Sequence, residues 1–202
     1  MLADSIQVAK RRGRQNGVSL LELLIGLAII SVMSAVALPS FMRSYRLYQL
    51  NDAAYKVAGI LKFTHYEAIR TSVPALAPLN AQVLLRPAGT YIFTDSNGSG
   101  TVDPTERQTL FSGAVTLIPS TTPPNTAGLA GAVGVAAFTN ISPTNGFISF
   151  DRRGAVVPPA VSVLYIGNTA LPNLGDRAVV VLPTGSIQVW STDVTGNWVR
   201  AD

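Results

Sequence analysis

An uninterrupted apolar segment near the N-terminus constrains this chain more than any other feature of its sequence. Residues 18–38 read VSLLELLIGLAIISVMSAVAL and contain one charged side chain, that of Glu22. As an α-helix they would rise about 30 Å, the thickness of the hydrocarbon core of a bilayer. Four basic residues between Lys10 and Arg14 precede the segment and no comparable cluster follows it. The positive-inside rule therefore predicts cytoplasmic residues 1–17 and a C-terminal part across the membrane.

The composition excludes several classes of function. Residues 1–17 hold four basic residues against Asp4, so they supply +3 of the formal net charge of +4. Basicity is therefore weak evidence for a polyanionic partner. The absence of cysteine excludes disulfides and thiolate metal sites. A single histidine, His65, without an evident activated nucleophile beside it predicts that the protein is not an enzyme.

Two ordinary interpretations of the apolar segment leave something unexplained. A plain transmembrane anchor gives no reason for Glu22, because a charge well inside a bilayer costs about 2.5–3.5 kcal/mol. A secretory signal peptide would be cleaved before Leu38, after the small-x-small sequence at residues 35–37. Glu22 interrupts the apolar core that such a signal needs, and this core is longer than usual.

A third interpretation accounts for all of these features. The sequence RRGRQNG at residues 11–17, followed by VSLLELL, resembles the class III (prepilin) signal of type IV pilins and type II secretion pseudopilins. The resemblance implies that a prepilin peptidase cleaves between Gly17 and Val18 and then methylates the amino group of Val18. It places Glu22 at the fifth mature position, where the family has a glutamate, and Pro39 at the twenty-second, where a helix-kinking proline is common.

The same resemblance implies a role for Glu22 in assembly. Removal of the leader exposes a positive amino group on each subunit. A carboxylate one helical turn further along can pair with that amine on a neighbouring helix, which neutralises both charges in an apolar filament core. We expect such a pair to set the register between subunits.

Beyond Pro39 the helical pattern continues. We expect an amphipathic helix over residues 39–72, which ends there because Pro74 disfavours helix in the residue before it. His65 is expected to be a polar residue on its surface. The apolar stripe predicted to lie on a globular head consists of Phe41, Tyr45, Tyr48, Ala54, Val57 and Leu61.

From residue 75 onward, Pro, Gly, Asn and Thr separate short apolar runs. Residues 75–202 therefore predict a β-rich head with an antiparallel sheet or sandwich. The stretch 119–134 is expected to be a long exposed loop. The expected strands are 82–86, 90–94, 108–111, 115–118, 133–138, 146–150, 161–166, 177–182 and 186–190.

The head also carries sequences that narrow the resemblance. FDRRG at 150–154, DRAVVV at 176–181 and PTGSI at 183–187 resemble the GspH/FimT domain. That resemblance implies an α+β, pilin-like fold in which a long N-terminal helix packs on an antiparallel β-sheet head. The ALPSF step at 37–41 is more similar to FimT/FimU type IV minor pilins than to the secretion pseudopilin.

The resemblance implies a structural subunit with defined partners. These would be the prepilin peptidase, other minor and major pilins or pseudopilins, and an inner-membrane assembly platform. The protein would cross the bacterial inner membrane once, with a periplasmic head. It would then join a type IV pilus, and the family expectation is a position at the tip. The alternative is a minor subunit of the type II secretion pseudopilus (protein H) that supports protein export.

A polar stretch at residues 95–106 has the ligand spacing of a twelve-residue calcium loop. It could equally be a β-hairpin connection, which needs Asn and Gly for positive φ angles. No cofactor is expected to be required. The oxygen ligands of the calcium interpretation are Asp95, Asn97, Ser99, Thr101, Asp103 and Glu106.

Nucleic-acid binding is disfavoured. Some FimT-type pilins bind DNA through arginines in the C-terminal tail, and the matching stretch here has Ser186 and Gln188 in their place. A basic patch could instead be formed by four arginines, although a solvated surface explains them as well. These arginines are Arg152, Arg153, Arg177 and Arg200.

Overall fold

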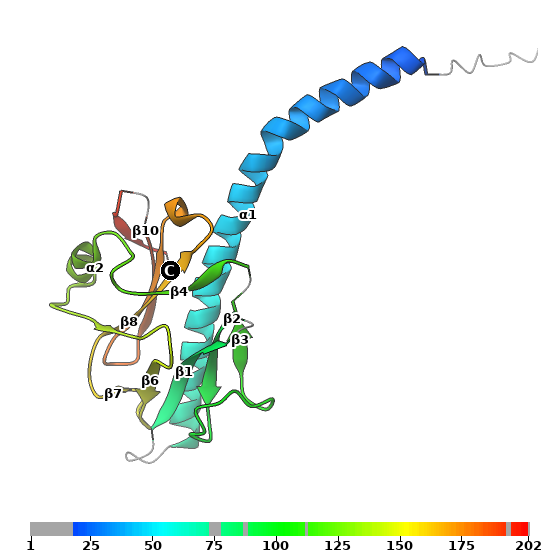
Figure 1. Cartoon of the computed structure of the whole chain (residues 1–202). Coiled ribbons are helices and arrows are strands. Elements are labelled where there is room, and N and C mark those ends of the chain that lie inside the picture. The colour runs from blue at the N-terminus through cyan, green and yellow to red at the C-terminus, as the bar shows by residue number, and fades with distance from the viewer. Residues whose placement is uncertain (1–17, 73–77, 87–88, 112, 193–194, 202) are drawn as a thin grey trace, which may run out of the picture. The chain divides into compact units, whose positions relative to one another are not determined.

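The structure is a computed structural model that describes residues 18–72, 78–86, 89–111, 113–192 and 195–201 (Figure 1). The expected leader, residues 1–17, lies outside the described residues, and Gly17 is its last residue. The chain divides into two compact units after Met42. Helix α1, Leu20–Thr71, contributes residues to both units.

The first unit consists of the N-terminal half of α1. The helix begins at Leu20, and the Leu23 amide donates to the Ser19 carbonyl at 3.1 Å. Within the described residues, α1 is the one helix long and apolar enough to cross a membrane, judged by length and composition. Pro39 lies inside the helix and has no N–H, so the Ala35 carbonyl loses its helical donor. A kink at Pro39 stays a prediction.

In the second unit, α1 buries one face against the head. The buried residues recur at helical spacing, and Leu50, Val57 and Leu61 are fully buried. Four alanines on this face let the strands approach the helix axis closely. The full set is Leu50, Ala53, Ala54, Val57, Ala58, Ile60, Leu61, Thr64 and Ala68.

The predicted apolar stripe was wrong in its first half. Tyr45 and Tyr48 are exposed, whereas Ala54, Val57 and Leu61 are buried as expected. A step of six residues turns an α-helix by about 600°, so Ala54 lies about 120° around the helix from Tyr48. The stripe therefore joined two different faces of one helix.

The head contains two β-sheets, and all strand pairs but one are antiparallel. The first sheet has, in spatial order, β3 (Gln108–Leu110), β2 (Gly89–Asp95), β1 (Leu79–Arg86), β6 (Phe147–Phe150) and β7 (Val156–Val157). The second has β11 (Trp198–Arg200), β10 (Ile187–Thr192), β9 (Arg177–Val181), β8 (Ser162–Asn168) and β4 (Val115–Ile118). The short strand β5 (Thr139–Asn140) pairs in parallel with β8. The predicted α+β class is thus confirmed.

Two apolar clusters hold the head together. The larger lies among α1 and both sheets and includes Leu61, Phe150 and Val179. The smaller lies on the other face of the second sheet, where Leu129 of helix α2 (Thr126–Val133) packs with Tyr165 and Trp190. Every residue of β8 and β9 is consequently buried. Central strands covered on both faces read as continuous apolar runs, as residues 178–181 do.

The segment after β4 differs from its expected loop. Residues 119–134 contain helix α2, and the strand predicted over 133–138 is absent from this described stretch. The Asn125 side chain caps α2 by accepting from the Gly128 amide at 2.9 Å. Gly134, at φ 79°, ends it by donating to the Ala130 carbonyl at 2.9 Å. An Asn and a Gly that bracket eight residues were the available helix signals.

Other elements complete the head. A short 3-10 helix, η1 (Pro172–Leu174), precedes β9. Strands β5, β7 and β11 were not among those expected, because each is only two or three residues long and has no periodicity of its own. Helix α2 is tied to the β11 end of the sheet, since Trp198 Nε1 donates to the Asn125 carbonyl at 2.9 Å.

Candidate functional site

The expected processing and assembly residues lie at the start of α1. Val18 immediately precedes the helix region and is exposed, and Glu22 occupies the first helical turn. A carboxylate there interacts favourably with the positive end of the helix dipole. Ser19 and Glu22 also have the spacing of a capping box, a local signal that sequence reasoning missed. Gly17, the other half of the expected cleavage site, lies outside the described residues.

Glu22 is available to a partner molecule. Its side chain is exposed, and within the described chain no hydrogen bond or ion pair engages its carboxylate. The surrounding side chains are large and apolar, and Leu20, Leu21 and Leu23 are each exposed. Burying one such side chain is worth about 1.5–3 kcal/mol. A surface of this kind is unfavourable in water and requires lipid or other helices around it.

The loop between β2 and β3 is organised around two buried carboxylates. Asp95, only 3% exposed, ends β2. Its Oδ1 accepts from the amides of Gly98 and Ser99, at 2.8 and 3.1 Å, and its Oδ2 accepts from the Gly100 amide at 3.0 Å. Such an Asx arrangement stabilises a tight turn without any ion.

Glu106 closes the other side of this loop. Its Oε1 accepts from the Ser96 amide at 2.8 Å, and its Oε2 accepts from the Asp103 amide at 3.2 Å. The Asn97 amide group donates to Asp103 Oδ2 at 2.6 Å. Ser99 Oγ and Thr101 Oγ1 lie 3.1 Å apart.

The six expected calcium ligands therefore lie in one loop, but their oxygens are engaged chiefly with the loop itself. In the part of the chain that the structure describes, no three His, Cys, Asp or Glu side chains are grouped to hold a metal ion. The hydrogen-bonded hairpin connection explains the loop without an ion. Calcium binding stays a prediction.

His65 brings together two of the sequences that carried the resemblance. Its ring lies edge-on to the Phe150 ring, with centroids 5.7 Å apart, and it packs against the turns at Gly154 and Gly185. Both glycines have positive φ, 78° and 82°. A Cβ on either would overlap the His65 ring, and one on Gly185 would also overlap the Gly154 carbonyl. The FDRRG and PTGSI sequences thus meet at one side chain.

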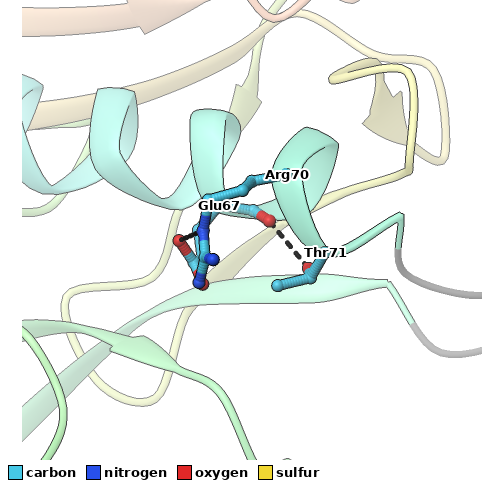
Figure 2. A network of polar contacts seen from close by, with 3 residues as sticks. All are labelled: Glu67, Arg70 and Thr71. Atoms are coloured by element: carbon cyan, nitrogen blue, oxygen red, sulfur yellow. Dashed lines mark hydrogen bonds and ion pairs between the residues drawn. The ribbon is translucent and has the colours of Figure 1, made fainter.

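The C-terminal end of α1 has an ion pair on its surface. Figure 2 shows Arg70 on the Glu67 carboxylate and the Thr71 hydroxyl on the Glu67 carbonyl. The Arg70 Nε donates to Glu67 Oε2 at 2.9 Å, and this bond lowers the pKa of the Glu67 carboxyl. The Glu67 carboxylate is therefore engaged with Arg70. Glu67 and His65 do not form an acid–base pair in the described structure.

The four arginines of the suggested basic patch do not all lie on the surface. Arg152 and Arg153, in the turn between β6 and β7, and Arg200 on β11 are exposed. Arg177 is only 7% exposed, at the start of β9. The proposal of a patch that includes Arg177 is wrong, because the strand register turns that side chain towards α1, where it contacts Asn51.

Comparison with known proteins identifies the N-terminal segment. The family model for the prokaryotic N-terminal methylation motif matches residues 12–38. Two crystal forms of the type IV minor pilin FimU of Pseudomonas aeruginosa are similar to the chain. The first has 18% sequence identity and a TM-score of 0.45, and the match covers 70% of this chain and 88% of the FimU chain. The second has 16% identity and a TM-score of 0.46, and the match covers 69% of this chain and 91% of the FimU chain. No curated protein matches the chain by sequence. The chain thus has a prokaryotic N-terminal methylation motif at the start of a long helix, followed by an antiparallel β-sheet head.

Proposed function

We propose that the protein is a minor subunit of a type IV pilus, incorporated at or near the tip, where it helps to prime assembly. The observation that carries this proposal is the methylation motif at residues 12–38, whose apolar helix bears one free carboxylate, Glu22. The apolar N-terminal window of α1, which is not buried within the described chain, needs lipid first and neighbouring helices afterwards. A pilin-type subunit uses the same segment for both.

The proposed route has three steps. The basic leader keeps the N-terminus in the cytoplasm, and the helix anchors the chain in the inner membrane with the head in the periplasm. A prepilin peptidase cleaves after Gly17 and methylates the Val18 amine. The assembly platform then extracts the helix into the filament, where the Glu22 carboxylate pairs with the N-terminal amine of a neighbouring pilin.

Substitution of Glu22 tests the assembly step. We expect Glu22→Ala and the nearly isosteric Glu22→Gln to be processed and inserted normally but lost from sheared filaments, because neither can neutralise the amine. Ser34→Ala, at an exposed position of the same helix, is the matched control and should be incorporated as the wild type is. Wild-type amounts of the Glu22 variants in filaments would refute the role of the carboxylate.

Mass spectrometry of the mature N-terminus tests the processing step. We expect a chain that starts at Val18 with a methylated amine. A chain that starts at Leu38 would instead identify an ordinary secreted protein, and an uncleaved chain would identify a plain anchor. Either result would overturn the proposal for both the pilus and the pseudopilus.

The second candidate is the minor pseudopilin of a type II secretion system. The ALPSF step at residues 37–41 favours the pilus. Deletion of the gene distinguishes the two: we expect loss of surface pili with protein export intact. The opposite pattern would assign the chain to the secretion pseudopilus. Immunogold labelling of sheared pili then tests the tip position, which predicts label at filament ends and not along their length.

DNA uptake is a weaker third role. The exposed arginines are Arg152, Arg153 and Arg200, of which Arg200 is already engaged in an interaction within the chain, and Arg177 is buried. We expect no salt-sensitive gel shift with the full chain in detergent, because few phosphate contacts give weak binding at physiological salt. A shift that weakens steeply with salt would establish the DNA role.

A further inference from the structure

A cavity of about 230 Å³ lies between α1 and the second sheet of the head. Its described lining residues include none from the loop at residues 95–106. The proposed assembly role makes no use of it. Its two apolar walls come from Ala54 of α1 and Val189 of β10. The described residues that line it are Asn51, Ala54, Tyr55, Arg177, Val189, Ser191 and Ala201.

Arg177 is the charged group of this cavity. The side chain is 93% buried, being 7% exposed. Its Nε donates to Asn51 Oδ1 at 2.7 Å, and its Nη1 donates to the Asp176 carbonyl at 2.8 Å. A guanidinium has five N–H donors, so these two bonds leave three. The two bonds also fix the plane of the guanidinium.

No carboxylate of the described residues forms an ion pair with Arg177. The charge of Asp176 partly offsets the effect of burial, which lowers the pKa of Arg177, but the hydrogen bond that Asp176 accepts from Arg177 is at its backbone carbonyl. The Tyr55 hydroxyl donates to the Ala201 carbonyl at 3.0 Å, and the Ser191 hydroxyl donates to the Val199 carbonyl at 3.3 Å. The two hydroxyls at the cavity are thus engaged, and no remaining N–H of Arg177 is among the buried polar atoms that lack a partner in the described chain, so these donors are open to solvent.

The donors of Arg177 that are open to solvent can be reached by an anion that enters the cavity. A guanidinium does not lose its proton at physiological pH, so burial of Arg177 keeps a charge in a poorly solvated place. An anion with good hydrogen-bond geometry can compensate such a partly desolvated charge. Two parallel N–H donors of a guanidinium match the two oxygens of a carboxylate.

We propose that the cavity at Arg177 binds a carboxylate group carried on a short aliphatic stem. The remaining guanidinium donors hold its two oxygens, and Ala54 and Val189 contact the stem. One cation in a small cavity suits a monoanion, because a doubly charged phosphate or sulfate would bring uncompensated negative charge into it. The carboxylate can belong to an acidic side chain of another polypeptide or to a small organic acid. This inference does not rest on the proposed function.

Nuclear magnetic resonance of the full chain in detergent micelles tests the site directly. The Nε–H signal of a buried arginine is slow to exchange, and the bond to Asn51 makes that of Arg177 observable. We expect acetate to shift this signal saturably at constant ionic strength, with chloride as the balancing salt. Failure of acetate to shift it, or an equal saturable shift with sulfate, would overturn the proposal.

Two further experiments identify the source of the carboxylate and test whether Arg177 binds it. A capped tripeptide Ala-Asp-Ala that shifts the signal at lower concentration than acetate would identify a polypeptide carboxylate, and the reverse order a small acid. The Asn counterpart of the peptide should have no effect. Arg177→Gln should abolish acetate binding, monitored by the backbone amide signal of Ser191 in the cavity lining, whereas the exposed Arg153→Gln should retain it. Ser191→Leu fills the cavity beside an intact Arg177 and should also abolish binding. Acetate binding that persists in a folded Arg177→Gln chain would refute the assignment.

Discussion

Gly185 and His65 are so close that a Cβ on the glycine would lie 2.6 Å from Cδ2 of the imidazole. Gly185 connects β9 and β10, and His65 comes from α1, so this contact joins the helix to the turn of a hairpin. The Gly154 carbonyl occupies the remaining space. The glycine is therefore required both by its φ of 82° and by its neighbours.

The first prediction follows from this contact. We expect Gly185→Ala to lower the free energy of unfolding by about 2–4 kcal/mol, since the left-handed backbone and the overlap each cost about 1–2 kcal/mol or more. Urea unfolding followed by tryptophan fluorescence reports on the head, where Trp190 and Trp198 both lie. Gly131→Ala is the control: no atom lies within 4 Å of its added Cβ, and alanine favours helix α2. Equal stability of the two variants would contradict the close contact.

The pH dependence of stability provides the second prediction. Burial lowers the pKa of the His65 imidazole. The unfolded chain then binds more protons than the folded chain as the pH falls through about 6.5, so stability is present above that pH and is lost below it. We expect His65→Gln to flatten the fall in urea midpoint between about pH 7.5 and about pH 5.5. An unchanged slope would show that other groups cause the fall.

Local sequence was sufficient to predict the N-terminal part of helix α1. The apolar length of residues 18–38 and the lone charge of Glu22 are properties of consecutive residues, and they determine a long helix whatever the head does. The strands at 108–110 and 115–118 were likewise predicted within one residue, because turn residues bracket them. The antiparallel head follows from such short runs.

The rest depends on contacts between distant residues. Arg177 lies in a sequence that reads as an ordinary strand start, and only the packing of β9 on α1 buries it beside Asn51. In the same way, nothing near His65 in the sequence indicates Gly154 or Gly185. Helix α2 has one buried side chain, Leu129, so it lacks the periodic apolar face by which a helix is recognised.

The third prediction tests which face of α1 packs on the head. Leu61 is fully buried, whereas Tyr48 is 67% exposed. We expect Leu61→Ala to lower the free energy of unfolding by about 2–5 kcal/mol, because it leaves a cavity in the main core. Tyr48→Ala should leave the urea midpoint nearly unchanged. A comparable loss in the two variants would mean that the first half of the predicted stripe does contact the head.

The fourth prediction concerns the loop that closes at Glu106, which is 7% exposed. Glu106→Gln replaces an acceptor with an NH₂ group opposite the amide of Ser96 or Asp103, so one buried donor loses its partner. We expect a loss of about 1–3 kcal/mol, while Glu67→Gln, at the surface pair with Arg70, should change little.

The same unfolding experiment tests calcium. If residues 95–106 bind the ion, millimolar calcium raises the midpoint of the wild type but not that of Glu106→Gln, since only the carboxylate can close the coordination shell. Identical wild-type midpoints with and without calcium would remove the calcium prediction and leave the hydrogen-bonded connection as the complete account of this loop.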